Sequence, residues 1–238
     1  SLAIVSALAA GCTQQAPATP PEAATLRTLG SLTFKPCSLA SPSPYGKPME
    51  AQCTTLDVPE DRSKPGGRSI ALNVAWIPPS NSSDPAADPV FFLAGGPGQA
   101  AVATFPGLAP VFKDVMKDRG IVLVDQRGTG KSNPLNCKSE GSEASGGDPA
   151  AARAWIQGCM DALSAKADLR RYTTTDAVAD LDAVRKAIGA DKLNLVGVSY
   201  GTRMAQQYAL RHPQHVRTVT LDSPVPNTIG LGNIFAGN

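Results

Sequence analysis

The residues with the clearest chemical meaning are the five of Gly197-Val198-Ser199-Tyr200-Gly201. The apolar run Leu193 to Val196 precedes them, and a helical pattern over Thr202 to Arg211 follows. A chain that turns this sharply from strand to helix holds its serine in a strained conformation with an exposed hydroxyl, and flanking glycines remove side chains that would clash there. The pattern therefore predicts Ser199 as a catalytic nucleophile. A phosphate-binding turn is the alternative, but the glycine spacings of such loops do not precede this helix.

A second Gly-rich segment, Leu93-Ala94-Gly95-Gly96-Pro97-Gly98-Gln99, directly follows a short apolar run that we interpret as a strand. Acyl transfer from a serine needs two backbone N–H groups aimed at the developing oxyanion. Tyr200, the residue after the nucleophile, is one predicted donor, and this segment should supply the other. We select Gly96, with Gly95 the next candidate, because Pro97 has no N–H.

A third segment, Asp125-Gln126-Arg127-Gly128-Thr129-Gly130-Lys131-Ser132, also follows an apolar run. We interpret it as a salt-bridged loop in which Asp125 or another carboxylate holds Arg127. A phosphate-binding role is disfavoured, because the upstream glycine of a P-loop is absent and Pro134 interrupts any following helix.

The elements that must position these segments alternate between strand and helix patterns. Short apolar runs predict strands, and apolar residues recurring every three or four positions predict helices. The predicted strands are Gln52–Val58, Ser69–Ile77, Val90–Leu93, Ile121–Val124, Leu193–Val196 and Arg217–Leu221, and the predicted helices are Asp176–Ile188 and Thr202–Arg211. This alternation is typical of crossover units in a mostly parallel sheet.

The composition suits such a core and argues against one class of partner. Hydrophobic residues make up 42% of the 238, which is enough for a folded domain. Lys and Arg number 22 against 20 Asp and Glu, for a net charge of +2. We therefore expect no nucleic-acid partner, since nucleic-acid affinity comes from clustered basic residues.

Taken in order, GGPGQ, DQRGTGKS and GVSYG resemble the proline iminopeptidase and tripeptidyl-aminopeptidase branch of the α/β-hydrolases, over about residues 50 to 225. The resemblance implies an α/β-hydrolase fold with helices on both faces of the sheet. It also implies a serine aminopeptidase, without a cofactor, that removes Pro or a short peptide from a substrate's free N-terminus. By position, Ser199 matches the family's nucleophile, and Gly96 and Tyr200 match its oxyanion donors. The family's usual His before the double glycine is Ala94 here.

The acid and base that a serine nucleophile needs are not evident. They follow the serine in the order Asp or Glu, then His. Of the two histidines, His212 lies roughly 18 Å from Ser199 along a helix rising 1.5 Å per residue, and His215 lies beyond it. Asp222 is a candidate acid in a variant arrangement. The resemblance implies that the acid, the base, the last strands and a helical cap follow Asn238, so we expect these 238 residues alone to hydrolyse little.

The N-terminal residues predict export. Ser1 to Ala10 is an apolar run typical of a signal peptide. We therefore interpret residues 1–11 as part of a signal peptide. Leu8-Ala9-Ala10-Gly11-Cys12 resembles the lipobox of bacterial lipoproteins, which implies cleavage before Cys12 and acylation of its thiol. Residues 12–30 would then be a Pro/Ala-rich tether that holds the catalytic domain, 31–238, at a membrane of the periplasm or cell envelope. Plain secretion as a soluble protein is the alternative.

The cysteine count agrees with lipidation. Five is an odd number in an exported chain, and lipid on Cys12 would leave four to pair. The nearest-neighbour pairs are Cys37 with Cys53 and Cys137 with Cys159, although three connectivities are open. The spacings are long for a zinc site, so we expect no metal.

Two further function classes stay open. An esterase or other acyl hydrolase would use the same turn and the same donors, because a fold does not determine the substrate. A tethered binding protein would retain the turn without a working triad.

Overall fold

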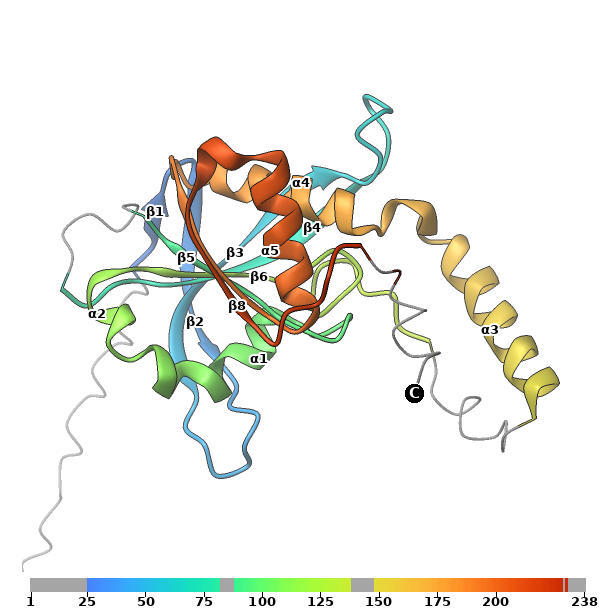
Figure 1. The fold of residues 1–238 in the computed structure, drawn as a ribbon, viewed down its shortest axis with the longest axis horizontal. Helices are drawn as coiled ribbons and strands as arrows, with labels where there is room; N and C mark the ends of the chain where they lie inside the picture. Colours follow the sequence, from blue (N-terminus) through green and yellow to red (C-terminus); the bar gives the residue numbers. More distant parts are fainter. Residues whose placement is uncertain (1–24, 82–87, 138–147, 229, 231–238) are drawn as a thin grey trace, which may run out of the picture.

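The structure, a computed structural model, describes residues 25–81, 88–137, 148–228 and 230. Its centre is an eight-stranded sheet in the order β1-β2-β3-β4-β6-β5-β7-β8 (Figure 1). The strands are β1 (Arg27–Leu29), β2 (Leu32–Leu39), β3 (Met49–Pro59), β4 (Ser69–Ile77), β5 (Val90–Leu93), β6 (Ile121–Val124), β7 (Leu193–Val198) and β8 (Val216–Asp222).

The helices flank this sheet. They are α1 (Ala101–Leu108), α2 (Val115–Asp118), α3 (Pro149–Ser164), α4 (Thr174–Ala187) and α5 (Tyr200–Arg211), with 3-10 turns at Ala109–Phe112, Leu169–Arg171 and Pro213–His215. Strands β6, β5, β7 and β8 pair in parallel. Strands β1 to β4 form an antiparallel meander, and β4 joins it to β6. The sheet is therefore mixed, and the motif-bearing segments follow its parallel strands.

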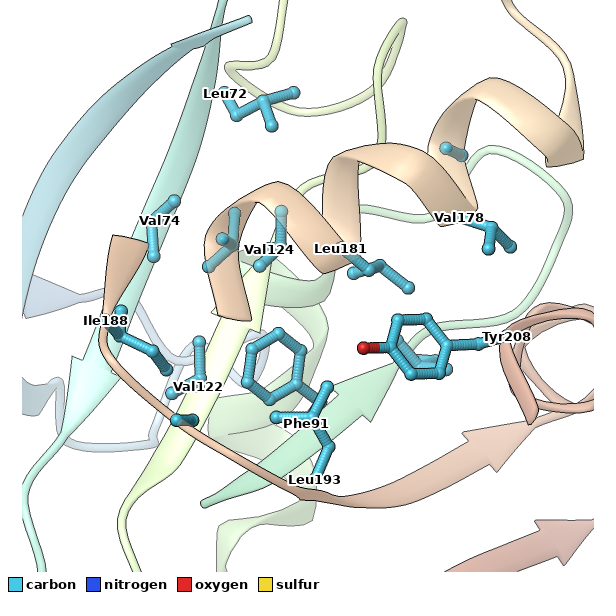
Figure 2. Packing of buried hydrophobic residues seen from close by; sticks show 14 of the residues in the cluster. Leu72, Val74, Phe91, Val122, Val124, Val178, Leu181, Ile188, Leu193 and Tyr208 are labelled. Atoms are coloured by element: carbon cyan, nitrogen blue, oxygen red, sulfur yellow. The ribbon is translucent and has the colours of Figure 1, made fainter. Parts of the chain in front are cut away.

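The core consists of two apolar layers, one on each face of the sheet. Strand residues alternate between the layers, so Phe91 packs with helices α4 and α5 while Phe92 packs with α1. Figure 2 shows the first layer, where Leu181 of α4 and Tyr208 of α5 lie over Phe91 and Leu193. Helices on both faces confirm the expected α/β architecture.

Helix α4 illustrates how local sequence sets an element's start. Thr173 is its N-cap, and the hydroxyl accepts a hydrogen bond from the N–H of Asp176 at 3.2 Å. The carboxylate of Asp176 lies in the positively polarised first turn, and Arg185 and Lys186 lie in the last turn. These charges complement the helix dipole, so the apolar spacing and the cap specify the same helix.

Helix α3 projects from the body (Figure 1) and has no buried residue. Its N-cap is Asp148, whose carboxylate accepts from the N–H of Ala150 at 2.9 Å, and Pro149 occupies the first turn. A disulfide between Cys137 and Cys159 ties the helix to the segment after β6.

Two differences from the sequence-based expectation concern the N-terminal part. Strands β1 and β2 were not expected, and β1 lies inside the range 12–30 that we assigned to a tether. Leu29 pairs with Leu32 and is only 3% exposed, so the packed domain already includes Arg27–Leu29. Cys12 and the residues predicted to belong to a signal peptide lie outside the described part of the chain. Within the described ranges, no helix has the length and apolar character needed to cross a membrane.

Candidate active site

Ser199 occupies the turn between β7 and α5. Its backbone has φ 52° and ψ −119°, a left-handed conformation that non-glycine residues rarely adopt. Hydrogen bonds hold Ser199 in this conformation. Its N–H donates to the carbonyl of Asp222 at 2.9 Å. Its carbonyl accepts from the N–H and the hydroxyl of Thr202, at 2.9 and 2.6 Å. The residue is partly exposed. The turn thus fixes the backbone of the serine at a partly exposed position.

The two glycines of this motif permit a close approach of strand and helix. A Cβ on Gly201 would overlap the carbonyl oxygen of Leu93, and one on Gly197 would overlap the carbonyl of Gly201. Because backbone atoms cannot move aside as a flexible side chain can, neither position tolerates a larger residue without a shift of the elements. This is the packing that the sequence pattern predicts.

The Gly-rich segment after β5 lies against the serine. A Cβ on Gly95 would be 3.2 Å from the Cβ of Ser199 and 3.2 Å from the carbonyl oxygen of Val198. Gly95 is buried, whereas Gly96 is exposed and has φ 103°. Strands β5 and β7 pair in parallel with Leu93 opposite Gly197, so both segments leave the sheet at the same edge. The choice of Gly96 over Gly95 as donor stays a prediction.

Tyr200, the other predicted donor, is the first residue of α5, where backbone N–H groups lack a partner within the helix. Its side chain is buried, and its hydroxyl lies 2.8 Å from the hydroxyl of Thr174 at the start of α4. The amide is therefore held at the site by a side chain anchored in the core.

Neither histidine lies near Ser199. His212 is at the opposite end of α5, its ring 4.9 Å from that of Tyr208, and burial lowers its pKa. Nδ1 of His215 lies 2.9 Å from the carbonyl of Asp191. Helix α5, with 12 residues and a length of roughly 18 Å, lies between Ser199 and both histidines. Since the sequence has two histidines in all, these 238 residues place none within reach of the serine.

Asp222 ends β8 and is hydrogen-bonded to the turn through its backbone. Its carbonyl accepts from the N–H of Ser199, while its carboxylate accepts from the hydroxyl of Ser223 at 3.0 Å. The residue is exposed. Its role as a triad acid stays a prediction.

The loop after β6 is salt-bridged, but Arg127 pairs with Asp180 of α4 and not with Asp125. Both Nε and Nη2 of Arg127 donate to the Asp180 carboxylate, at 2.7 and 2.8 Å, and Nη1 donates to the carbonyls of Glu60 and Arg171. Burial opposes the charge of Arg127, but the hydrogen bonds that Arg127 donates to Asp180 outweigh the effect of burial and raise the pKa of Arg127 above its usual value. Sequence reasoning missed Asp180, although its spacing from Ala177 placed it beside the apolar face of the helix.

Glu60 and Tyr172 extend this buried network. The Tyr172 hydroxyl donates to Glu60 at 3.0 Å, and the same carboxylate oxygen accepts from the N–H of Asp168 at 3.0 Å. Burial raises the pKa of Tyr172 to about 12, so the phenol stays protonated as a donor. The network joins the β3–β4 hairpin to the segment that leads into α4.

The four cysteines of the described residues form the nearest-neighbour disulfides, Cys37–Cys53 between β2 and β3 and Cys137–Cys159 at α3. Among the described residues no group of three or more His, Cys, Asp or Glu is arranged to hold a metal ion.

Comparison with known proteins places these features in a family context. The family profile described as "alpha/beta hydrolase fold" matches residues 88–236. The tripeptidyl aminopeptidase of Streptomyces lividans is 32% identical over 198 residues, which cover 76% of this chain and 36% of that protein. The serine protease Hip1 of Mycobacterium bovis is 29% identical over 211 residues, covering 82% and 40%. The proline iminopeptidase of Neisseria gonorrhoeae is 31% identical over 140 residues, covering 59% and 34%. The chain thus spans well under half the length of these relatives.

Proposed function

Because this chain belongs to the α/β-hydrolase family, and its relatives include aminopeptidases, we propose that it is the nucleophile-bearing part of a serine aminopeptidase. The substrate would be a peptide with a free N-terminus, from which Pro or a short peptide is released. The observation that carries the proposal is the positive φ of the partly exposed Ser199, which lies against the turn at Gly95.

The proposed reaction is acyl transfer. Oγ of Ser199 attacks the carbonyl carbon of the scissile bond while a base removes the hydroxyl proton. The N–H groups of Tyr200 and Gly96 stabilise the negative charge that develops on the carbonyl oxygen. Collapse of this intermediate expels the amine, which takes the proton from the base. Water then attacks the acyl-enzyme through the same steps and regenerates Ser199.

The base and the orienting acid would come from residues outside these 238. Support for this comes from His212 and His215, which both lie at the far end of α5, and from the greater length of the relatives. Activity is therefore a property we assign to the full-length protein, meaning the complete polypeptide that the gene encodes.

Labelling with a fluorophosphonate tests the nucleophile. We expect the full-length protein to be labelled at Ser199, and Ser199→Ala to abolish labelling. Ser223→Ala, which changes an exposed serine at the end of β8, should leave labelling unchanged. A wild-type protein that resists the probe would instead support a binding protein that retains an inert turn.

Substrate class needs a separate comparison. We expect aminoacyl and peptidyl p-nitroanilides with a free N-terminus to be cleaved in preference to the same compounds with a blocked N-terminus and to short-chain p-nitrophenyl esters. Preference for the blocked compounds or the esters would favour the esterase alternative.

Attachment to a membrane through lipid on Cys12 is a further part of the proposal, resting on Leu8 to Cys12 and the Pro/Ala-rich residues after it. Metabolic labelling with an alkyne-bearing fatty acid should tag the wild type and not Cys12→Ala. Recovery of untagged wild-type protein from the medium or the soluble periplasmic fraction would favour plain secretion.

A further inference from the structure

We propose that Asp125 is a positioning residue for the Gly-rich segment after β5, residues 95–99, which we call the oxyanion turn. Asp125 would act on this segment through the N-terminal end of helix α1. The inference rests on the proposed function. Asp125 follows β6 directly and is 1% exposed, and among the described residues no basic side chain forms an ion pair with it. Its carboxylate instead accepts hydrogen bonds from three separate parts of the fold, one of which is the helix that follows the Gly-rich turn.

The bond to α1 replaces a local cap. The N-cap residue of this helix is Ala100, whose side chain cannot accept a hydrogen bond. Oδ1 of Asp125 accepts from the N–H of Val102 in the first helical turn at 3.0 Å. An anion is favoured at this end of a helix, where the N–H groups point outward and the dipole is positive. Asp125 thus caps α1 from 23 residues away in the sequence.

The other oxygen anchors the carboxylate. Oδ2 accepts from the side-chain amide of Asn73 on β4 at 2.8 Å and from the N–H of Lys131 at 3.1 Å. Gly130 leaves the space that this arrangement needs, since a Cβ there would overlap Oδ2 and come within 2.8 Å of the Cβ of Ala100. The carboxylate of Asp125 therefore lies between the sheet and the N-terminus of α1, and it is hydrogen-bonded to both.

The helix start and the oxyanion turn form one continuous unit. Six residues, Gly95 to Ala100, connect the position against Ser199 to the capped end of α1. Within them the N–H of Gln99 donates to the carbonyl of Gly95 at 3.3 Å. Displacing the start of α1 would therefore displace Gly95, which lies against Ser199, and Gly96 next to it. Oxyanion donors act through pre-set geometry, so a small displacement weakens catalysis more than it weakens binding.

The test is Asp125→Asn in the full-length protein. An amide offers one acceptor oxygen and turns its NH2 group toward either the Val102 N–H or the donors from Asn73 and Lys131. We expect kcat to fall by about 10- to 100-fold, with KM changed less than about twofold. Affinity for a peptide aldehyde, which forms a tetrahedral adduct with the serine, should fall in proportion to kcat.

Ser132→Ala is the matched control. Ser132 lies in the same loop and is fully buried, and its hydroxyl oxygen accepts from the N–H of Asn73 at 2.8 Å. In the described part of the chain, no hydrogen bond joins Ser132 to α1. It should lower the melting temperature but leave kcat and aldehyde affinity within about twofold of the wild type. If Asp125→Asn folds poorly, Val102→Pro provides a second variant, because it removes the donating N–H in a helical turn that tolerates proline.

The outcomes separate the two proposals. An active wild type whose Asp125→Asn or Val102→Pro variant keeps its kcat and aldehyde affinity overturns the positioning role alone. Equal losses of kcat in the Asp125 and Ser132 variants would show a merely structural role and also overturn it. A wild type inert toward fluorophosphonate and substrate overturns the proposed function and this inference with it.

Discussion

The close approach of β5, β7 and α5 depends on glycines at single positions. At Gly201 a methyl group would overlap a backbone carbonyl of β5, which cannot rotate away. We therefore expect Gly201→Ala to lower the free energy of unfolding by about 3 kcal/mol or more, through overpacking. Urea denaturation of the chain would measure the change, and Ser199 labelling of the full-length variant should fall as well.

Gly158→Ala is the matched control for that substitution. Gly158 lies within α3, and a Cβ there would have no atom within 4 Å. Alanine is the better helix former, so the unfolding free energy should stay unchanged or rise by up to about 1 kcal/mol. Equal destabilisation at both glycines would contradict the steric explanation.

Asp182 gives a pH-dependent prediction at the same scale. Burial by itself would raise the pKa of Asp182, but hydrogen bonds from Lys186 and Arg185 outweigh burial and lower the pKa to about 2. A carboxyl whose pKa is lower in the folded state stabilises the fold above its ordinary pKa, and this contribution is lost as the pH falls from about 4 to 2. The contribution amounts to about 2 kcal/mol.

Unfolding of wild type and Asp182→Asn across pH 5 to 2 would measure this contribution. The variant should be less stable at pH 5, and its stability should fall less steeply on acidification, since the amide does not titrate. Asp191→Asn, at an exposed position, controls for the loss of one negative charge. Parallel pH profiles for wild type and Asp182→Asn would contradict the prediction.

At the scale of elements, helix α3 depends on its disulfide. It has no buried residue, and Ile156 and Met160 are exposed on it. Replacing Cys137 and Cys159 by serine should therefore raise amide hydrogen exchange throughout α3 while exchange in the sheet changes little. Exchange monitored by mass spectrometry would measure both regions.

The second disulfide provides the control for the first. Cys37–Cys53 joins β2 and β3, which also pair through their backbones, with Lys35 opposite Cys53. The loops closed are similar, 16 and 22 residues, so loop entropy alone would stabilise both by about 3 kcal/mol. We expect opening Cys37–Cys53 to raise amide exchange in β2 less than opening Cys137–Cys159 raises it in α3. Equal increases would contradict the explanation that strand pairing and packing hold β2 in place.

Elements with one clear pattern could be predicted from the sequence, whereas those with conflicting signals could not. Helix α4 combines apolar spacing with a cap, and β5 and β6 are short apolar runs. Helix α1 contains Pro106 and Gly107, both unfavourable inside a helix, yet it forms because Phe105 packs against Phe92 at 5.5 Å. That contact joins residues distant in the chain, and no local pattern reveals it.

The same reasoning applies to the site. Strand-turn-helix context sufficed to predict Ser199 at a sharp turn before a helix, because this feature is local, although the helix begins at Tyr200 and not at Thr202 as predicted. The partner of Arg127 was not predictable, since Asp180 is 53 residues away and only the fold brings α4 to the loop. Asp125 as a remote cap of α1 was equally hidden, because the sequence shows only that Ala100 cannot cap the helix.

At the scale of the whole molecule, strand order brings the two halves of the site together. The order β6-β5-β7-β8 makes β5 and β7 neighbours although β6, α3 and α4 lie between them in the chain, and Leu93 pairs directly with Gly197. Parallel neighbours end at the same edge of the sheet, where the loops after them form a site. Folding of the central sheet therefore brings together the Gly-rich segment after β5, Ser199 and the amide of Tyr200.

The same architecture places both histidines at the end of α5 that is remote from Ser199. We therefore expect the 238-residue chain to have little hydrolytic activity by itself. A serine nucleophile with oxyanion donors but without a general base gives residual catalysis at most. We expect this chain alone to cleave an aminoacyl p-nitroanilide at least about a thousandfold more slowly than the full-length protein, with Ser199→Ala variants of both as baselines. His212→Ala and His215→Ala should leave the full-length rate unchanged. Equal rates for the two polypeptides, or loss of activity in either histidine variant, would show that the base lies within these residues.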